Sequence, residues 1–548
     1  MHEPLDFKNY VLGELHKLLH EGRFAVPKLQ RVFVWNGRKA ANLLDTVYRR
    51  MPIGALTIWD TESANRNLLR VESTVLPPYN NANKRVWFVL DGQQRLSVLY
   101  RILEGGTVTT GSKGEVDFSR LVFRVTEGDT PSRFQYRKPV PKEWISLPDI
   151  LDANWQSKHL GLSKRQLNRV EDCRTRLLTY PVPIVVMSME SIEDARELFL
   201  RINSSGTPLS SADRAFARAS KFDLREMART SWEKLKPEFR GLDNEVLLQT
   251  RALLDDVLDV GVDAMNKVVD QWDTRIKSDA GEIKRFNREW DAQRTAMNLA
   301  IDLLSKQFHV LDEGLLPSRN MVTTLTVFFY ENKRRPSQNQ MREIKKWFWG
   351  TALGQRYSGR GFRQNILDDV SFFRKLATGT EVKFKLSELI DPADVKRAVY
   401  GKRSSISDAF FCLLIGQVPQ RFSDGTSLHL DDPASAANRK HKHHIFPRKL
   451  LRNHGVGTGT LNTILNLCFI SADENSQFGA RSPLNYLRPH LHSTHFSRVI
   501  NRHLIPQGDD SGLWQANKKG YDLFIRNRKK LVCKAFEIAA GTKLFRKE

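Results

Sequence analysis

A change in hydrophobic pattern near residue 220 divides the sequence. Before it, short apolar runs such as residues 86–90 (VWFVL) and 181–189 (PVPIVVMSM) predict buried strands. These runs alternate with stretches such as 42–50, whose apolar residues recur at helical spacing. From about 221 to 420, strand-like runs become rare and charged stretches with helical apolar spacing dominate. We therefore expect a mixed α/β domain followed by a helical domain.

Length and composition indicate several globular domains. The chain has 548 residues, which is too many for one hydrophobic core, and 40% of them are apolar. Residues 423–440 are rich in Ser, Asp, Ala and Pro, which is typical of a linker or an entry loop. We expect a multidomain α+β protein with domains at 1–220, 221–422 and 423–548.

A strong positive charge predicts a polyanionic partner. The chain has 86 Lys and Arg against 62 Asp and Glu, and residues 439–548 alone have 20 against 7. Such a field favours DNA, RNA or an acidic membrane surface. The basic residues do not follow one long amphipathic segment, and there is no run of about 18 apolar residues. We therefore expect a nucleic acid and no membrane.

Cysteine usage favours a reducing, cytoplasmic location. The four cysteines are far apart and form no C-x-x-C pair, which also argues against a Cys-based zinc site. They are Cys173, Cys412, Cys468 and Cys533. The start of the chain is amphipathic and contains acidic residues, unlike a secretory signal.

Three histidines lie within four positions in the C-terminal part. His441, His443 and His444 precede Ile-Phe-Pro; a strand-like LCFI follows, with Asn466 before it and Asn475 after it. A histidine pair alone is usually part of a polar loop. Phosphodiester hydrolysis, however, requires a base that titrates near neutrality and a cation, and these residue types can supply the base and bind the cation. The order His-His, Asn, Asn therefore favours a metal-dependent phosphodiesterase centre.

These residues resemble a known nuclease motif. Residues 435–490 resemble the ββα-metal, or HNH, finger, and most closely the nuclease part of GmrSD-type modification-dependent restriction systems. The resemblance implies that His444 is the catalytic base and that His443 and Asn475 bind a divalent metal. It also implies that Asn466 supports catalysis by orienting the base loop or holding the hairpin. Many HNH enzymes have Asp where His443 stands, so Zn²⁺ or Ni²⁺ is open beside Mg²⁺ or Mn²⁺.

A basic helix is expected near the C-terminus. Residues 521–536 (YDLFIRNRKKLVCKAF) predict an amphipathic helix whose apolar face, including Phe524 and Val532, belongs to the core. Its basic residues are either DNA-backbone contacts or solvated side chains. They are Arg526, Arg528, Lys529 and Lys530.

Residues 89–100 (VLDGQQRLSVLY) have the form of a strand, a turn and a helix that starts near Gln93. A helix N-terminus after a glycine turn is a ready anion site, and Arg95 lies one helical turn after Asp91. Alternatively, Asp91 is only the N-cap of a buried helix. The sequence contains no G-x-x-x-x-G-K-[ST] motif, so this is not a P-loop.

Two further stretches extend this motif into a family resemblance. Residues 26–35 (VPKLQRVFVW) and 199–210 (FLRINSSGTPLS), together with DGQQR, resemble the ParB/sulfiredoxin-like N-terminal domain of GmrSD-type systems. That domain binds and hydrolyses nucleoside triphosphates and is associated with sensing modified DNA. Leu29 and the pair Ser204–Ser205 depart from the family pattern, which leaves the shape of the pocket open. The implied nucleotide-binding residues are Gln30, Arg31, Asp91, Gln93, Gln94, Arg95, Arg201 and Asn203.

Both ends of the chain thus resemble the same two-part system, in the same order. The combination predicts an NTP-regulated, divalent-metal-dependent endonuclease that cleaves foreign DNA, with modified phage DNA as the expected substrate. The expected partners are double-stranded DNA and a nucleoside triphosphate, and a homo-oligomer is open. Two alternatives also stay open: an NTP-responsive DNA-binding regulator whose HNH fold is only structural, and a toxin-like nuclease that acts on host nucleic acid.

Overall fold

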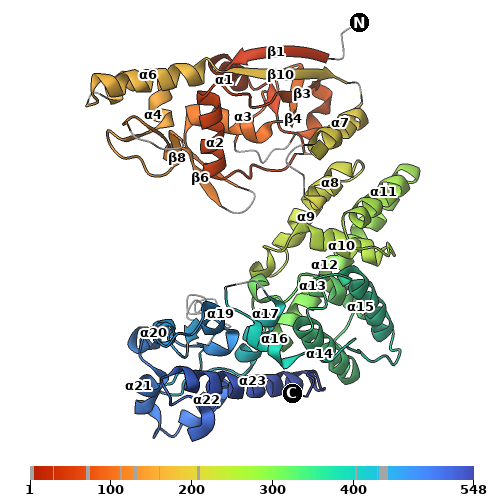
Figure 1. The fold of residues 1–548 in the computed structure, drawn as a ribbon. Helices are drawn as coiled ribbons and strands as arrows, with labels where there is room; N and C mark the ends of the chain where they lie inside the picture. The colour runs from red at the N-terminus through yellow and green to blue at the C-terminus, as the bar shows by residue number, and fades with distance from the viewer. Residues whose placement is uncertain are drawn as a thin grey trace. The chain divides into compact units, whose positions relative to one another are not determined.

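Two compact units make up the chain in the computed structural model, Met1–Ser220 and Lys221–Glu548, called here the N-terminal and C-terminal units (Figure 1). The predicted boundary between 422 and 423 falls inside the C-terminal unit and stays a prediction. Leu29 and His441 lie outside the described residues. The structure describes residues 5–28, 30–69, 75–110, 114–127, 132–159, 161–189, 191–205, 210–401, 404–428, 430 and 442–547.

A five-stranded mixed sheet forms the centre of the N-terminal unit, in the order β1-β10-β3-β4-β2. Its strands are β1 (Leu5–Val11), β2 (Phe24–Ala25), β3 (Leu56–Glu62), β4 (Arg85–Asp91) and β10 (Pro181–Ser188). The pairs β10–β3 and β2–β4 are parallel, whereas β1–β10 and β3–β4 are antiparallel. Smaller sheets comprise β5 (Thr107–Thr109), β6 (Glu115–Asp117), β7 (Leu121–Arg124), β8 (Phe134–Tyr136) and β9 (Trp144–Ser146). The strands predicted at 86–90 and 181–189 are therefore confirmed.

Two apolar clusters hold helices against this sheet. The larger cluster includes residues of the sheet and of the helices α1 to α4 and α6, whereas Ala195 of α7 belongs to a separate cluster with Trp59 and Phe88. The helix predicted at 42–50 is confirmed within α2. The helices are α1 (Leu12–His20), α2 (Gly37–Tyr48), α3 (Gln93–Glu104), α4 (Leu147–Leu151), α5 (Trp155–Lys158), α6 (Lys164–Leu178), α7 (Ile192–Ser205) and α8 (Ser211–Arg218).

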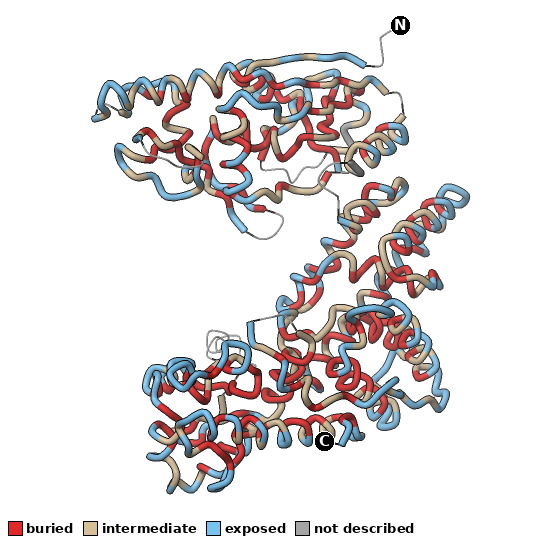
Figure 2. The backbone as a smooth tube through the Cα atoms, in the orientation of Figure 1, coloured by how far each residue is buried: buried red, intermediate tan, exposed pale blue. Residues whose placement is uncertain are grey.

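The first part of the C-terminal unit is helical, as the periodicity predicts. Helix α13 is buried from Met321 to Phe329, because its apolar residues and threonines pack against α10, α12 and α15 (Figure 2). The helices of this part are α9 (Leu224–Glu233), α10 (Asn244–Leu254), α11 (Val262–Ser278), α12 (Glu282–Phe308), α13 (Asn320–Asn332), α14 (Gln338–Leu353), α15 (Phe362–Ala377), α16 (Pro392–Arg397) and α17 (Ser405–Gly416).

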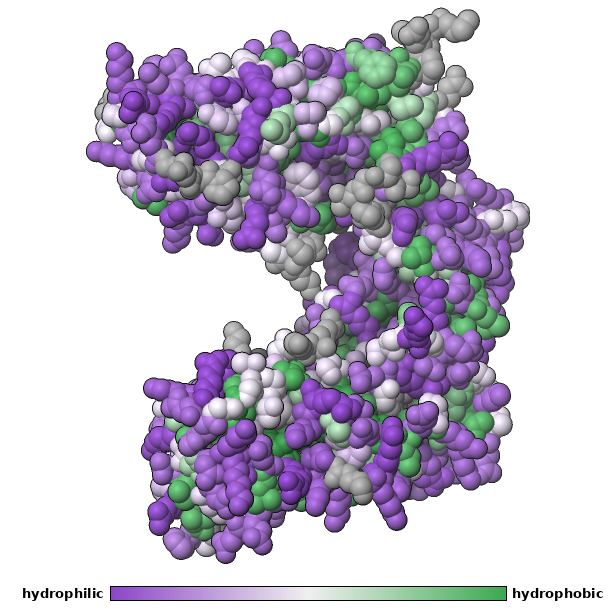
Figure 3. All heavy atoms as spheres, viewed as in Figure 1, coloured by the Kyte–Doolittle hydropathy of each residue, from purple (hydrophilic) through white to green (hydrophobic). Residues whose placement is uncertain are grey.

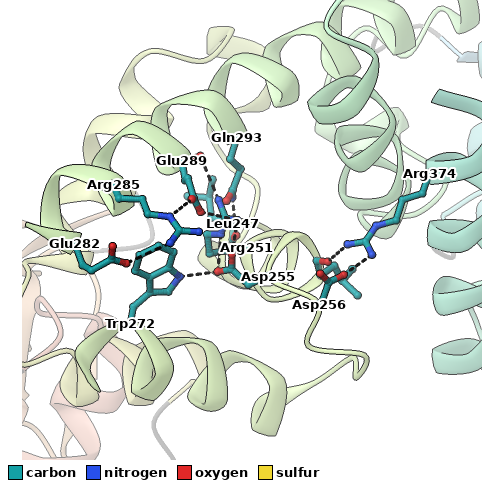
Figure 4. A network of polar contacts seen from close by, with 11 residues as sticks. Leu247, Arg251, Asp255, Asp256, Trp272, Glu282, Arg285, Glu289, Gln293 and Arg374 are labelled. Atoms are coloured by element: carbon teal, nitrogen blue, oxygen red, sulfur yellow. Dashed lines mark hydrogen bonds and ion pairs between the residues drawn. The ribbon is translucent and has the colours of Figure 1, made fainter. Parts of the chain in front are cut away.

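A polar network fastens four of these helices together (Figure 4). Arg251 of α10 is buried and pairs with Asp255 at 2.7 Å, and Asp255 also accepts a hydrogen bond from the indole of Trp272 on α11. The Arg251 guanidinium donates to a backbone carbonyl of α12. Arg374 of α15 pairs with Asp256. Because a buried charge is costly unless it is paired, the contacts of Arg251 fix how these helices pack.

The chain after the helical part forms a two-stranded sheet, short helices and a long terminal helix. These are β11 (Lys442–His444), α18 (Arg448–Asn453), α19 (Thr458–Leu461), β12 (Leu467–Phe469), α20 (Ala472–Phe478), α21 (Pro483–Leu487), α22 (Phe496–Arg502) and α23 (Lys518–Ala540). The predicted strand LCFI and the predicted helix at 521–536 are confirmed as β12 and as part of α23.

Backbone contacts join this last part to the helices before it. The N–H of Tyr400 donates to the carbonyl of Asn462 at 2.9 Å, and the N–H of Ile464 donates to the carbonyl of Ala398 at 3.0 Å. Helix α23 also packs along α14, α16 and α17. The segment that contains β11 and β12 is therefore built into the same compact unit as the helical part.

The surface is largely polar, which agrees with the charged composition of the chain. The face seen in Figure 3 is largely hydrophilic, with apolar residues scattered across it. All four cysteines are buried and free. Among the residues that the structure describes, no helix is both long and apolar enough to cross a bilayer.

Candidate functional site

The histidine-containing segment forms a small antiparallel ladder beside a helix. In the ladder, His443 of β11 lies opposite Cys468 and His444 lies opposite Leu467 of β12. Helix α20, which contains Asn475, begins three residues after β12 ends. Adjacent residues of a strand point to opposite faces, so His443 and His444 meet different partners. We call residues 442–478 the finger segment.

His443 faces the helix of the finger segment. Its Nδ1 lies 3.1 Å from Oδ1 of Asn475, and its ring packs against Phe478 and Tyr486. Burial lowers the pKa of His443 to about 4, which keeps the imidazole neutral at pH 7. Within the described residues, Nε2 of His443 is buried and has no hydrogen-bond partner.

The spacing of His443 and Asn475 fits two ligands of one divalent cation. Two ligand atoms at right angles, each about 2.1 Å from an ion, lie about 3 Å apart. The observed 3.1 Å between Nδ1 and Oδ1 agrees with this geometry. A neutral imidazole and an amide oxygen are also the protonation states that metal binding requires. The predicted pair of ligands therefore suits a cation that keeps several water ligands.

His444 is oriented by a residue that the sequence did not single out. Its Nε2 lies 3.3 Å from Oδ1 of Asn462, which follows α19 directly. An amide oxygen can only accept, so Nε2 of His444 must carry the proton and Nδ1 is left as the basic nitrogen. Burial lowers the pKa of His444, and the charge of the exposed Arg448 lowers it further. His444 is thus neutral and ready to accept a proton near neutral pH.

Asn466 holds the loop that follows β11. It is fully buried; its Oδ1 accepts from the N–H of Phe446, while its Nδ2 donates to the carbonyls of Phe446 and Leu461. The distances are 2.9, 3.0 and 3.1 Å. Since all these groups belong to the protein, Asn466 positions the loop behind His444. Its contacts are compatible with both predicted roles, orienting the base loop and holding the hairpin, and its part in catalysis stays a prediction.

Helix α20 is anchored by the residue before Asn475. Glu474 is fully buried and accepts hydrogen bonds from the N–H of Ser423 and the hydroxyl of Ser471. Asp473 forms an ion pair with Arg421. These contacts fix the helix to the chain that precedes the finger segment, so Asn475 is presented to His443 by a rigid support.

The four basic residues predicted on α23 differ in their surroundings. Arg526 and Lys530 are exposed and Lys529 is half-buried, so they can meet a polyanion. Arg528 is fully buried and donates to the carbonyls of Leu465, His503 and Leu504 at 2.7 to 3.0 Å. Burial lowers the pKa of Arg528 to about 10. Arg528 therefore has a structural role instead of the predicted DNA contact, because its guanidinium is buried and already donates to backbone carbonyls.

In the N-terminal unit, the DGQQR motif forms the predicted strand, turn and helix. Strand β4 ends at Asp91, and α3 begins at Gln93. Gly92 has a φ of 85°, and a Cβ there would lie 2.3 Å from Leu56, so only glycine fits. Gly92 is the N-cap of α3, and Asp91 instead pairs with Arg95 at 2.7 Å. The alternative that Asp91 is the N-cap is therefore wrong.

Arg95 and two glutamines of the predicted nucleotide site are engaged with the protein. Arg95 donates to the carbonyl of Ile53 at 2.6 Å in addition to its pair with Asp91. Gln30 is buried and donates to the carbonyls of Val89 and Leu90. The side chain of Gln94 bonds the backbone of residues 32, 34 and 35. These contacts fasten the segment 30–35 to β4 and α3.

Two other residues of the predicted set leave polar groups available. Oε1 of Gln93 is buried at the start of α3 and, in the described part of the chain, has no hydrogen-bond partner. Arg31 is half-buried and makes no side-chain hydrogen bond or ion pair with the residues described. Together with the free N–H groups of the first turn of α3, they offer donors and an acceptor at one end of the sheet.

The last two predicted nucleotide-binding residues lie on α7. Arg201 is exposed and pairs with Glu197, and Asn203 donates to the carbonyl of Phe199 one turn earlier. Both of these contacts stay within α7. The side chains at 204 and 205 lie outside the description. The participation of Arg201 and Asn203 in a nucleotide site stays a prediction.

Sequence reasoning missed Asn462 and Arg448. Asn462 contacts His444 across 18 residues, and no motif or periodicity marks it. Arg448 directly follows the Ile-Phe-Pro of the motif, so its place next to His444 could have been found from the sequence.

Comparisons with known proteins agree with the resemblance at the N-terminal end. Residues 12–219 match the family model described as the N-terminal domain of the GmrSD restriction endonuclease. This match supports a GmrSD-type N-terminal domain over residues 12–219. An uncharacterized protein of Methanocaldococcus jannaschii is 24% identical over 527 residues, which cover 88% of this chain and 87% of that protein. The likeness to that protein thus includes residues of both units.

Proposed function

We propose that this protein is a divalent-metal-dependent DNA endonuclease of the HNH type, whose N-terminal unit binds a nucleoside triphosphate and regulates cleavage. The observation that carries the proposal is the pairing of His443 with Asn475 at 3.1 Å, beside a neutral His444 that Asn462 orients. The restriction-type N-terminal domain supports foreign DNA as the target. Phage DNA with a modified base is the substrate that this reading favours.

The proposed reaction uses the two histidines for different tasks. Nδ1 of His444 takes a proton from the attacking water, while Asn462 keeps the proton on Nε2. His443 and Asn475 hold a divalent ion, which when bound would stabilise the negative charge that develops on the phosphate. Arg448 is exposed next to His444 and can bind the same phosphate group through its guanidinium.

The nucleotide is proposed to bind at the N-terminus of α3. The free N–H groups of its first turn, Arg31 and the unpartnered Oε1 of Gln93 provide complementary groups for phosphate and sugar. Arg95 and Asp91 then act as a support below the site, since their pair also holds the backbone at Ile53. A change in this pair on nucleotide binding would reach β3 and β4 directly.

A cleavage assay tests the proposal. The full chain is incubated with unmodified and modified phage DNA, with Mg²⁺ or Mn²⁺, and with or without each nucleoside triphosphate. We expect His444→Ala to lose at least about a hundredfold in rate, the contribution typical of a general base. The matched control His492→Gln removes an exposed histidine and should cleave like the wild type.

The outcomes separate the alternatives. If the wild type binds DNA but never cuts it under any of these conditions, the regulator is favoured. If host DNA or RNA is cut as readily as phage DNA, the toxin-like nuclease is favoured. If His444→Ala cuts as fast as the wild type, the finger segment is not the catalytic centre.

A further inference from the structure

A cluster outside the finger segment brings together two histidines and a glutamate. His16 and His20 lie one turn apart on α1, and Glu104 is the last residue of α3. Nε2 of His16 lies 2.7 Å and Nε2 of His20 lies 3.0 Å from the same oxygen of Glu104. The three potential ligand atoms all lie within 4.8 Å of one another.

The local structure fixes the directions of both imidazoles. Residues four apart on a helix share one face, so His16 and His20 point the same way. Each ring centroid lies 5.7 Å from that of Tyr100, and the two imidazoles meet edge to face at 4.5 Å. Because Tyr100 and Glu104 are also four residues apart, α3 supplies both the packing surface and the carboxylate. The convergence of the three side chains is thus built by two rigid helices.

The electrostatic surroundings favour a cation. Both helices end at the cluster, α1 at His20 and α3 at Glu104, and the carbonyl ends of helices attract positive charge. A carboxylate at the end of α3 is itself unfavourable there unless a cation compensates for it. Burial disfavours the charged carboxylate of Glu104, but its contacts with His20 and His16 lower its pKa overall, so the carboxylate is ionised and can bind a cation.

The spacing is close to that of a tetrahedral metal site. Ligand atoms about 2.0 to 2.1 Å from an ion in a tetrahedron lie about 3.4 Å apart. The observed 2.7 and 3.0 Å require only small side-chain rotations to reach this value. The side chains are 25%, 48% and 32% exposed, so an ion can enter and a water molecule can complete its coordination.

We propose that His16, His20 and Glu104 form a binding site for a transition-metal ion of the Zn²⁺ class that clamps α1 to α3. Two imidazoles and one carboxylate suit Zn²⁺, Co²⁺ or Ni²⁺, whereas Mg²⁺ prefers oxygen ligands alone. The site is separate from the finger segment in sequence and lies in the other unit. It does not depend on the proposed nuclease reaction.

Metal titration of the full chain tests this site. The protein is prepared without a histidine tag and carries His443→Ala and Asn475→Ala, which remove the proposed ligands of the finger segment. Zn²⁺ binding is measured by calorimetry, and Co²⁺ binding by its visible absorption, both in excess Mg²⁺. We expect one bound Zn²⁺ per chain in this background.

Variants of the cluster identify the ligands. Glu104→Gln and His20→Gln, each in the same background, should weaken Zn²⁺ binding at least about tenfold, while His492→Gln should leave it unchanged. Circular dichroism confirms that each variant is folded, and Glu104→Gln keeps the shape of the side chain. The proposal is overturned if the background protein binds no Zn²⁺, or if both cluster variants bind it as tightly as the background does.

Discussion

Replacing Asn466 with alanine would remove three hydrogen bonds from the loop behind His444. The N–H of Phe446 would lose its acceptor, and the carbonyls of Phe446 and Leu461 would lose a donor, all in fully buried surroundings. At about 1 kcal/mol for each bond, the loss is about 3 kcal/mol, and unsatisfied buried groups raise it toward roughly 5 kcal/mol. This is a large part of the roughly 5–15 kcal/mol that stabilises a typical domain.

Asn475→Ala is the matched control, because it removes the same side chain nine positions later. Among the described residues, the side chain of Asn475 makes one hydrogen bond, to His443, and Glu474 continues to anchor its helix. We therefore expect a loss of at most about 1 kcal/mol from Asn475→Ala. Asn475→Ala should instead weaken metal binding at the finger segment.

Hydrogen exchange of the full chain gives the appropriate readout, since a chain of two units does not unfold in one step. The amides of Ile445 and Phe446 and those of β12 report the free energy of local opening. We expect it to fall by about 3 kcal/mol or more in Asn466→Ala and to stay within about 1 kcal/mol of the wild type in Asn475→Ala. Equal losses in the two variants would refute the division into a structural and a ligand asparagine.

Two further substitutions test the interior of the C-terminal unit. Arg528→Met leaves three carbonyls without this donor, two of them buried, and should cost about 3 kcal/mol in thermal unfolding. Arg526→Ala, on the exposed side, should cost less than about 0.5 kcal/mol. An unchanged melting temperature for Arg528→Met would contradict the structural role of Arg528. His503 is fully buried, donates to the carbonyl of Gln420 at 2.7 Å, and has its pKa lowered by burial to about 4. The unfolded chain binds a proton at this residue near pH 6.5 and the folded chain does not. The free energy of unfolding therefore falls by on the order of 3 kcal/mol as the pH falls from 6.5 to 4. Urea denaturation measures the difference in the free energy of unfolding between wild type and His503→Gln. We expect this difference to become smaller as the pH falls across this range. A constant difference would argue against a buried neutral imidazole.

Local patterns predicted the elements that carry the motifs. The run VWFVL followed by Asp-Gly predicts a strand that turns into a helix, and β4, Gly92 and α3 follow it residue by residue. Such a turn depends on neighbours in sequence, since Gly92 is required by its own φ and by close packing on Leu56. The contacts of Gln30 and Gln94 were different, because each joins segments about 60 residues apart. The motif match therefore led to the prediction that Gln30 and Gln94 contact a ligand. In the structure, their side-chain hydrogen bonds instead hold segment 30–35 to β4 and α3.

The interpretation of Arg528 shows a signal that was present but overlooked. Phe524, Arg528 and Val532 are spaced by four, so the arginine lies on the apolar face of α23 that the same periodicity identified. The surrounding basic run made it look like part of an exposed surface. Asn462 offers no comparable signal, because its contact with His444 exists only once α19 has packed beside β11.

The bonds between the helical part and the chain beside the finger segment have a consequence for how that segment can be transplanted. The backbone of Asn462, whose side chain orients His444, is itself held by the N–H of Tyr400. A cassette that begins at residue 423 would carry every motif residue and leave behind Ala398 and Tyr400, whose backbone holds Asn462 and Ile464 in place. Gene fusions that transplant the finger segment should therefore retain the chain from about α16 onward, because a fusion at the motif boundary alone would leave His444 and Asn462 loosely aligned.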